Sequence, residues 1–253
     1  MQEDKKIKNI QSVHRALDIL EYLVASGGGK KLSEIAADCG LNKTTAFHLV
    51  KTLEARGYVE QSPDSLKYKY GGTLFQMATR VYQNIDLLSI CTPCMEQLFD
   101  RYHETVGLYH YMKLDDKMQS LCIQYIESTN PVKVSLSVGK WFPLHCTAVG
   151  KLYLSALDDE NLNFELNRTD LSEHEIKKLS AHLKQIREQR YCVECEEFEN
   201  GITNIAVPIY KWSGRVLAAI CISLPTQRTT TELLAEISKE MVPFSHQLSK
   251  LNL

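Results

Sequence analysis

The first part of the chain contains three runs in which apolar positions recur with helical spacing. The first run covers residues 12–24, and its apolar positions are Val13, Ala16, Leu17, Leu20, Leu23 and Val24. Spacing of i, i+3, i+4 and i+7 predicts a helix with these residues on one buried face. The three glycines at 27–29 then end this helix, because consecutive glycines make continued helix costly.

Two more helices follow at short spacing. One side of the second run, residues 32–39, is apolar and consists of Leu32, Ile35, Ala36 and Cys39. Gly40 stands where a left-handed residue commonly ends a helix, and Asn42 is a suitable N-cap for the next one. The inner side of the third run consists of Ala46, Leu49, Val50 and Leu53. Helix, short glycine turn and helix together predict a helix-turn-helix motif.

The opposite side of the third helix is polar. Thr44, His48 and Lys51 lie at i, i+4 and i+7 and share this face, while Lys43 and Thr45 flank them near its start. Hydroxyl, imidazole and ammonium groups are the donors and acceptors that a helix in a DNA major groove needs. A polar face is also common on helices that only face water, but the helix-turn-helix spacing favours DNA binding.

Two short alternating runs after the third helix predict a β-hairpin. They cover residues 58–60 and 67–70, and the sequence between them, Ser-Pro-Asp-Ser at 62–65, is typical of a turn. This hairpin would form the wing of a winged helix-turn-helix. Lys67 and Lys69 fall on one face of it, and we expect them to contact the DNA backbone.

The remainder of the chain alternates between strand and helix patterns. Strands are predicted from apolar or alternating runs at 104–113, 118–128, 132–138, 202–210 and 216–224. Helices are predicted at 73–80, across the segment DLLSICTPCMEQLFDRY, at 172–189 and at 231–251; Ser172 and Glu175 form a capping box at the third of these. Neighbouring strands joined by turns and flanked by helices indicate an α+β domain with a mostly antiparallel sheet.

Charge and composition refine this picture. The net charge of −2 does not itself suggest a nucleic-acid binder, but residues 1–71 hold 11 Lys and Arg against 9 Asp and Glu, whereas the rest is acidic. The polar start MQEDKKIKNIQ is no signal peptide, and no apolar run is long enough to span a bilayer. We therefore expect a cytoplasmic protein that does not bind a membrane.

Eight cysteines include two C-x-x-C pairs, Cys91–Cys94 and Cys192–Cys195. Zinc binding by both pairs is one hypothesis, although about 100 residues separate them and structural zinc sites are usually more compact. A thioredoxin-like redox site is another, but it needs a strand before the first pair, where the pattern favours helix. The simplest interpretation is reduced, partly buried thiols, with no metal and no cofactor.

Two segments of the front part resemble a known family. SVHRALDILEYL and LSEIAADCGLNKTTAFHLVKTLEARGYVE are similar to the winged helix-turn-helix of the IclR family of bacterial transcription regulators. That family commonly has Arg where this chain has His48, so a neutral hydrogen bond is the alternative contact there. In the back part, PLHCTAVGKLYLSAL, ECEEFENGITNIAVPIY and GRVLAAICISLP are similar to segments of the family's effector domain.

The resemblance covers nearly the whole chain and implies its organisation. It implies a DNA-binding domain at 1–72, a linker helix at 73–85 and a GAF-like effector domain at 86–253. It also implies a pocket for a small organic effector, at the positions Leu144, Ala148, Val149, Glu194, Asn204, Cys221 and Ser223.

Two positions depart from the family's usual residues at this pocket. Asn204 stands where Cys is usual, and Cys195 stands where an acidic residue is common. An amide there suits a ligand that has a carboxylate, amide or hydroxyl group, and a helix beginning near Ala148 favours an anionic group. More ordinary interpretations are that Cys221 faces the core and that Glu194 belongs to a solvated acidic loop.

The sequence therefore predicts a sequence-specific DNA-binding regulator whose operator affinity responds to an effector. We expect a homodimer or dimer of dimers on a pseudo-palindromic operator. One alternative is a back domain that dimerises without a ligand. Another is an enzyme using His145 and Cys146 with Glu194, but adjacent residues seldom form a nucleophile–base pair, and the chain has none of the common catalytic or nucleotide-binding motifs.

Overall fold

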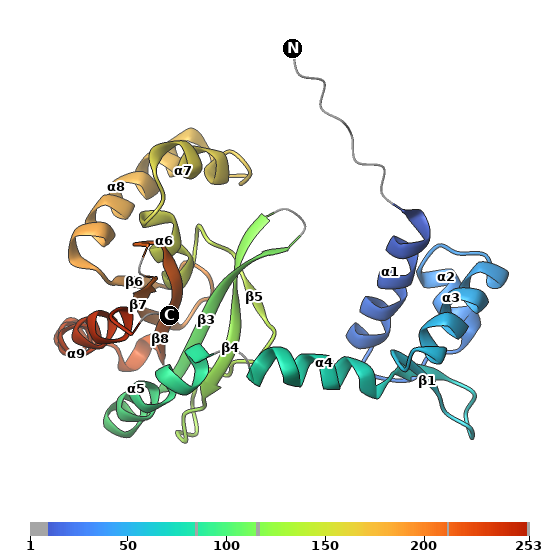
Figure 1. Ribbon diagram of the computed structural model, residues 1–253. Helices are drawn as coiled ribbons and strands as arrows, with labels where there is room; N and C mark the ends of the chain where they lie inside the picture. Colours follow the sequence, from blue (N-terminus) through green and yellow to red (C-terminus); the bar gives the residue numbers. More distant parts are fainter. Residues whose placement is uncertain (1–9, 84–85, 115–116, 212, 252–253) are drawn as a thin grey trace, which may run out of the picture. The chain divides into compact units, whose positions relative to one another are not determined.

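The chain forms two compact units, Met1–Ile85 and Asp86–Leu253, in the computed structural model (Figure 1). The structure describes residues 10–83, 86–114, 117–211 and 213–251. The end of the expected linker, residues 84 and 85, lies outside the described residues. The domain boundaries 1–72, 73–85 and 86–253 stay a prediction.

The first unit is a winged helix-turn-helix. Its elements are α1 (Gln11–Ala25), α2 (Leu32–Asp38), α3 (Lys43–Ala55), β1 (Val59–Gln61), β2 (Tyr68–Tyr70) and α4 (Gly72–Gln83). Gly40 has a φ of 62°, which glycine adopts readily, and so ends α2 as the sequence predicts. The Asn42 side chain accepts a hydrogen bond of 2.8 Å from the Thr45 N–H, which confirms it as the N-cap of α3.

The buried face of α1 differs from the predicted one. Ile19 and Leu23 are fully buried against α3 and the wing, but Val13, Leu17 and Val24 are 50–54% exposed. The sequence contains two overlapping apolar stripes along this helix, and periodicity alone does not distinguish which one meets the core. The prediction is confirmed for Leu20 and Leu23, which pack in the core, and was wrong for Val13, Leu17 and Val24, which leave an apolar strip on the surface of α1.

The predicted hairpin is confirmed. β1 and β2 pair antiparallel with Glu60 opposite Lys69, and Tyr68 is buried in the core of the unit. An isolated bridge joins Lys30 to Tyr68, so the loop after α1 is tied to the wing. The core residue Tyr68 therefore fixes the wing to the three helices.

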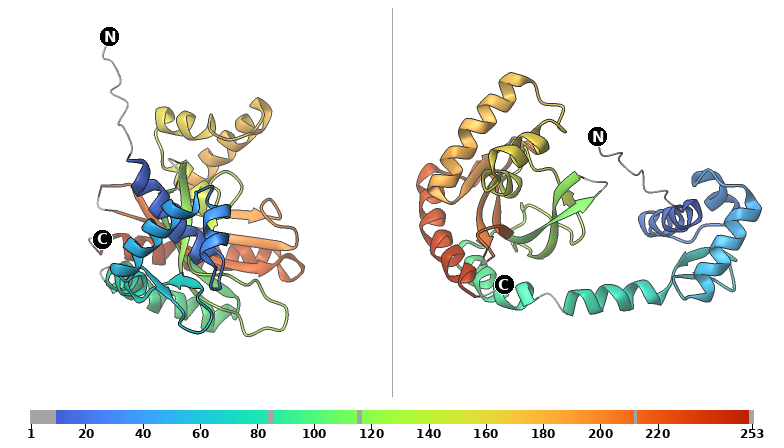
Figure 2. Two further views of the ribbon diagram at one scale, coloured as in Figure 1. Left: turned by 90° about the vertical axis from the view of Figure 1, so that its right-hand side faces the viewer. Right: turned by 45° about the horizontal axis from the view of Figure 1, so that its top comes forward.

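The second unit is a six-stranded antiparallel sheet between two groups of helices (Figures 1 and 2). The strand order is β5-β4-β3-β8-β7-β6. The strands are β3 (Thr105–Leu114), β4 (Lys117–Ile126), β5 (Trp141–Phe142), β6 (Cys192–Cys195), β7 (Ile202–Tyr210) and β8 (Val216–Pro225). The helices are α5 (Asp86–Tyr102), α6 (Ala148–Ser155), α7 (Asp159–Leu166), α8 (Glu173–Gln189), the short η1 (Thr226–Arg228) and α9 (Thr231–Ser249). The predicted α+β class with an antiparallel sheet is thus confirmed.

The two faces of this sheet pack against different helices. α5 and α9 contact one face through β3 and β7, while α6 and α8 cover the other, as Figure 1 shows. Side chains alternate between the faces along a strand, so Cys221 of β8 joins the core on the α6 side. The buried interior on that side is where a ligand site would be enclosed.

Several elements differ from the sequence expectation. The run 132–138 is not a strand, although its burial alternates: Val134 and Leu136 are 8% exposed and Val132 is 63% exposed. Its backbone does not join the ladder, since β5 pairs with β4 instead and Thr105 donates to the Val134 carbonyl at 2.6 Å. Helix α7, the strands β5 and β6 and the short η1 were not predicted.

The cysteine pairs lie in ordinary secondary structure. Cys91 and Cys94 are inside helix α5, and burial raises the pKa of Cys91 to about 12. The redox hypothesis therefore lacks the preceding strand it needs. Cys192 is buried and Cys195 exposed on β6, and all eight cysteines are free thiols. Among the described residues no group of three or more His, Cys, Asp or Glu is placed to hold a metal, and no helix is long and apolar enough to cross a membrane.

Candidate DNA-binding surface and effector pocket

The outer face of α3 is open to solvent. Lys43, Thr44 and His48 are exposed, and Thr45 is half-buried beside the Asn42 cap. The inner face is fully buried at Ala46 and Val50, so packing against α1 and α2 holds the helix in a fixed orientation. Four of the predicted DNA-binding residues thus lie together near the N-terminal end of one helix.

Lys51 is not a free cation as the sequence suggested. Its ammonium lies 2.7 Å from a Glu54 carboxylate oxygen and 5.6 Å from the centre of the Tyr68 ring. The hydrogen bond to Glu54 raises the pKa of Lys51, and burial opposes this shift. Glu54 thus offsets part of the positive charge that Lys51 was expected to present to phosphates.

The wing lysines differ from each other. Lys69 forms an ion pair of 2.8 Å with Glu60 on the opposite strand, and more than half of each side chain is exposed. Exposed pairs of this kind are weak, so this ammonium remains available to another anion. Lys67 is half-buried, and its Cβ would lie 2.9 Å from a Cβ built on Gly29. The loop after α1 therefore packs directly against the Lys67 stem.

Phe47 also belongs to the exposed face of α3. It follows Thr44 by three positions and Lys51 follows it by four, so it shares their side of the helix. Its side chain is 42% exposed, and its ring meets that of His48 edge-on, with centroids 5.7 Å apart. Sequence reasoning missed it, although an aromatic residue outside the inner apolar stripe was a visible signal.

A small cavity lies between the sheet, the start of α6 and the loop after β6. Its volume is about 50 Å³. Five of the seven predicted effector residues line it: Ala148, Val149, Asn204, Cys221 and Ser223. Tyr109, Phe142 and Phe198 form aromatic walls that the sequence did not identify, since they come from three distant segments.

The floor of this cavity is a continuous hydrogen-bond chain. The Ser223 hydroxyl donates to the Asn204 side-chain carbonyl at 2.6 Å, and the Asn204 amide donates to Glu194 at 2.6 Å. The other Glu194 oxygen accepts from the backbone N–H groups of Glu197 and Phe198 at 2.6 and 3.2 Å. Asn204 is thus held from both sides, which leaves only part of its amide for a ligand.

Glu194 does not line the cavity, but it positions Asn204 and the loop with Phe198, which do. Its side chain is fully buried, so the interpretation as part of a solvated loop was wrong at this residue. The burial follows from strand β6, which pairs Glu194 with Asn204 at the edge of the sheet. Through the two backbone N–H bonds, this carboxylate fixes the loop that carries Phe198 into the cavity wall.

Helix α6 begins at the cavity. The Thr147 hydroxyl accepts from the Gly150 N–H at 3.1 Å and donates to the Pro143 carbonyl at 2.6 Å. The first-turn residues Ala148 and Val149 line the cavity, and first-turn N–H groups have no partner inside a helix. The start of α6 therefore offers donors and a positive dipole end to an anionic group.

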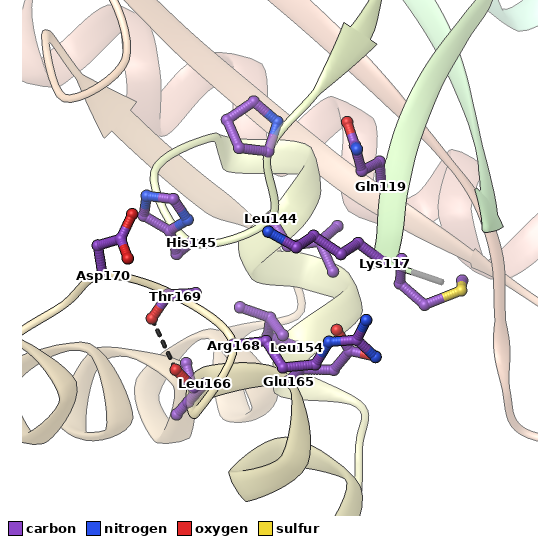
Figure 3. Close-up of a pocket in the computed structure, with 12 residues that line it drawn as sticks. Lys117, Gln119, Leu144, His145, Leu154, Glu165, Leu166, Arg168, Thr169 and Asp170 are labelled. Carbon is purple, nitrogen blue, oxygen red and sulfur yellow. Dashed lines mark hydrogen bonds between the residues drawn. The ribbon is translucent and has the colours of Figure 1, made fainter. Parts of the chain in front are cut away.

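Leu144 lies on the other side of the same loop. It lines a second cavity of about 260 Å³ with His145, the start of β4 and the end of α7 (Figure 3). A Cβ on Gly150 would lie 2.3 Å from the Leu144 backbone, which shows how closely α6 packs against this loop. The structure therefore separates Leu144 from the other predicted cavity residues.

His145 and Cys146 do not form a nucleophile–base pair in the structure. Figure 3 places His145 beside Asp170, and burial lowers the pKa of His145. Burial raises the pKa of the Cys146 thiol, so the nucleophilic thiolate is disfavoured. In the described part of the chain, no hydrogen bond joins the two side chains.

An ion pair between buried Lys151 and half-exposed Glu197 links α6 to the loop over the cavity. Lys151 is 1% exposed, and its ammonium lies 2.5 Å from a Glu197 oxygen. Glu196 and Gly201 have φ values of 57° and 80°, so the loop turns sharply at both ends. Lys151, through Glu197, and Glu194, through the N–H groups of Glu197 and Phe198, hold the loop 196–201 in place beside the cavity.

Comparison with known proteins identifies the family. The model described as "Bacterial transcriptional regulator IclR C-terminal" matches residues 79–250, and the "IclR helix-turn-helix domain" matches residues 12–63. The chain belongs to the IclR family. As an IclR-family member it is a transcriptional regulator with a DNA-binding helix-turn-helix domain and an effector-binding domain, which confirms the predicted class of function.

Individual members of the IclR family match this chain over nearly its whole length. The regulator XynR of Escherichia coli is 30% identical over 247 residues, covering 95% of this chain and 96% of that protein. The acetate operon repressor of Salmonella typhimurium is 28% identical, covering 95% and 89%. A crystal structure of an IclR regulator from Alicyclobacillus acidocaldarius has a TM-score of 0.79 at 24% identity, covering 97% of this chain and all of that one.

A second solved structure contains a ligand. It is an IclR homologue from Microbacterium hydrocarbonoxydans in complex with 4-hydroxybenzoate, with a TM-score of 0.78 at 21% identity, covering 94% of this chain and 99% of that one. At this identity the likeness shows the shared fold.

Proposed function

We propose that this IclR-family regulator reads its operator with the outer face of α3 and steadies itself with the wing. Lys43, Thr44, Thr45 and His48 would meet the major groove at the N-terminal end of the helix. The observation that carries this proposal is the exposure of Lys43, Thr44 and His48 on a helix whose opposite face is anchored by the fully buried Ala46 and Val50. Such a face is held rigidly and is open to a large partner.

The lysines would contribute unequally to phosphate binding. Lys43 is exposed and stands at the first turn of α3, whereas Lys51 and Lys69 each face a carboxylate of their own unit. A DNA phosphate that must compete with such a carboxylate gains less binding free energy from the lysine ammonium. Lys43 would therefore make the strongest phosphate contact, with Lys51, Lys67 and Lys69 supporting it.

We further propose that two or four copies act together on a pseudo-palindromic operator. Helix-turn-helix dimers bind two half-sites about one helical turn apart. The exposed strip of α1, with Val13, Leu17 and Val24, supports contacts between copies, because contiguous apolar surface is uncommon where nothing covers it. Such a regulator acts at the chromosome, so we place it in the cytoplasm.

The effector would be a short organic acid bound in the cavity of about 50 Å³. The first turn of α6 suits its carboxylate, and Ser223 and Asn204 suit a hydroxyl or oxo group beside it. A volume of about 50 Å³ holds roughly four waters, which corresponds to a few non-hydrogen atoms. The 4-hydroxybenzoate complex of a related protein supports an organic acid, but a ligand of that size would require the loop 196–201 to shift.

The effector would act by its different affinity for two states of the regulator. The cavity has no arrangement of nucleophile and base, and the curated relatives are regulators, so we propose binding without catalysis. The second candidate is a back domain that only joins copies. A ligand-binding experiment separates the two.

The DNA-binding proposal is tested with the full chain and a random duplex library. We expect selection of a sequence with two related half-sites, and an affinity that falls as salt rises, because phosphate contacts release counterions. Failure to enrich any sequence at low salt would contradict the proposal.

The effector proposal is tested by thermal unfolding with pyruvate, lactate and 4-hydroxybenzoate. We expect the two short acids to raise the melting temperature of the wild type more than the aromatic acid does. Phe198→Ala removes an aromatic wall and should move the preference toward 4-hydroxybenzoate. If no organic acid shifts the melting temperature or operator binding, the ligand-free dimerisation domain is favoured.

A further inference from the structure

The outer face of α3 combines an aromatic side chain with few free cationic groups, which is unusual for a surface that contacts DNA bases. The side chains that follow each other along it are Thr44, Phe47, His48 and Lys51. Lys51 is engaged by Glu54 and the Tyr68 ring, and the face has no arginine. Guanine is most often read by a bidentate Arg or Lys. This face therefore lacks a free group of that kind at its centre.

Phe47 lies at the edge of this face that adjoins buried Val50, beside Thr44 and Lys51. The core is already closed by Ala46 and Val50, which are fully buried, and Phe47 is 42% exposed. Its ring meets the His48 ring edge-on at an interplanar angle of 71°, and the exposed part of the side chain is accessible from solvent. The apolar ring is thus presented outward between polar neighbours.

The major groove offers one apolar group, the C5-methyl of thymine. Contact with Phe or with a Thr methyl is a recognised way of reading it. We propose that Phe47, assisted by the Thr44 methyl, reads thymine methyl groups, so that the half-site carries thymines where this face meets the groove. This inference rests on the proposed function and adds the base class that α3 selects.

A DNA partner fits this surface better than a second protein chain does. The ring is flanked by exposed Lys43, Thr44 and His48, which suit phosphates and base edges. Phe47 lies on the same helix face as these groups, whereas the apolar strip of α1 is on a separate helix. A groove lined by methyls and hydrogen-bonding edges matches the mixture of groups on α3.

The test uses deoxyuridine in place of thymidine, because it removes only the methyl group. The probe is a duplex of the sequence that the full-length wild type selects from a random library, with the thymines of one half-site replaced in turn. We expect about fourfold weaker binding for each contacted methyl, which corresponds to about 0.8 kcal/mol. Phe47→Ala should bind the thymine duplex more weakly and should no longer distinguish it from the deoxyuridine duplex.

Two further variants make the result specific. Phe47→Leu keeps an apolar side chain and should retain part of the methyl preference. Phe164→Ala removes another exposed phenylalanine, from α7 in the other unit, and should keep the full preference. Unfolding and oligomeric state are measured for each variant, and we expect Phe47→Ala to match the wild type in both.

Three results would overturn the inference. They are an equal deoxyuridine effect in Phe47→Ala and wild type, unchanged DNA affinity in Phe47→Ala, or dissociation of the oligomer by that substitution. The last would show that Phe47 faces another copy of the chain. If the wild type selects no DNA sequence at all, the proposed function itself fails. If it selects a sequence but its affinity does not depend on thymine methyls through Phe47, only the role of Phe47 is overturned.

Discussion

The outer face of α3 and the floor of the cavity beside α6 hold their polar groups in opposite ways. On α3, Thr44 and His48 are exposed and the helix is kept in place by its other side. In the cavity, Glu194, Asn204 and Ser223 are joined to one another and to the backbone. The first surface depends on a partner for its contacts, while the second is already satisfied and determines the shape of its own loop.

This difference predicts which substitutions change function alone and which also change folding stability. Substitutions on the α3 face should change DNA binding and leave folding nearly unchanged. Substitutions in the cavity floor should change both, because a buried polar group that loses its partner is costly. Four variants test the contrast.

The largest effect is expected for Glu194→Ala. It removes a buried carboxylate that accepts from Asn204 and two backbone N–H groups, so these donors lose their partner. We expect a loss of about 3 kcal/mol in unfolding free energy, roughly 10 °C in melting temperature. Thermal unfolding measures it, with exposed Glu199→Ala as the matched control; equal melting temperatures for both variants would refute the positioning role.

The second effect concerns DNA. Lys43→Ala combined with Thr44→Ala removes one phosphate contact and one hydroxyl, and we expect about tenfold weaker operator binding with a smaller salt dependence. The melting temperature should stay within a degree or two of the wild type, since both side chains are exposed. Fluorescence anisotropy measures the binding, and unchanged affinity would mean that this face does not meet DNA.

A smaller effect on the unfolding free energy is expected at the ion pair between Lys151 and Glu197. Glu197→Ala leaves the buried Lys151 ammonium without its carboxylate, at a cost of about 1 kcal/mol because Glu197 itself is half exposed. Lys151→Met in the same chain should recover part of this loss, because Met fills the space without a charge. Chemical denaturation compares the single and double variants, and purely additive losses would show that the two residues act independently.

The smallest expected effect is an increase in operator affinity. Glu54→Ala frees the Lys51 ammonium from its partner at 2.7 Å, so Lys51 can meet a phosphate at full charge. We expect operator affinity to rise two- to threefold at low salt and the gain to vanish as salt increases. Glu60→Ala, which frees Lys69, serves as the comparison on the wing. If Glu54→Ala binds no better at any salt concentration, Lys51 is not near the DNA backbone.

Local patterns in the sequence were sufficient for the elements that carry their own signals. Gly40 and Asn42 mark the turn between α2 and α3 because their preferences act within a few residues. The capping box of Ser172 and Glu175 likewise marks the start of α8, with the Ser172 N–H donating to Glu175 at 2.8 Å. The outward position of Thr44 and His48 followed from the helical repeat alone.

Features that depend on distant contacts were not predictable in this way. Alternation over 132–138 reflects real alternate burial, but the partner for its backbone is the Thr105 hydroxyl rather than a strand. Along α1, two apolar stripes overlap, and only packing against α3 and the wing shows that Ile19, rather than Val13 and Leu17, joins Leu23 in the core. The cavity walls Tyr109, Phe142 and Phe198 have no common sequence signal, because they meet only after the sheet has formed.

The sequence by itself determined the helix-turn-helix with its exposed polar face and the wing. Through the family resemblance it also indicated five of the residues that line the cavity. The tertiary structure decided which charges are already neutralised by neighbours, as in Lys51 with Glu54 and Lys151 with Glu197. It also decided that Glu194 is buried and supports the cavity rather than lining it. The physical reason is range: helix periodicity and capping act over a few residues, whereas burial and charge pairing depend on residues that only the folded chain brings together.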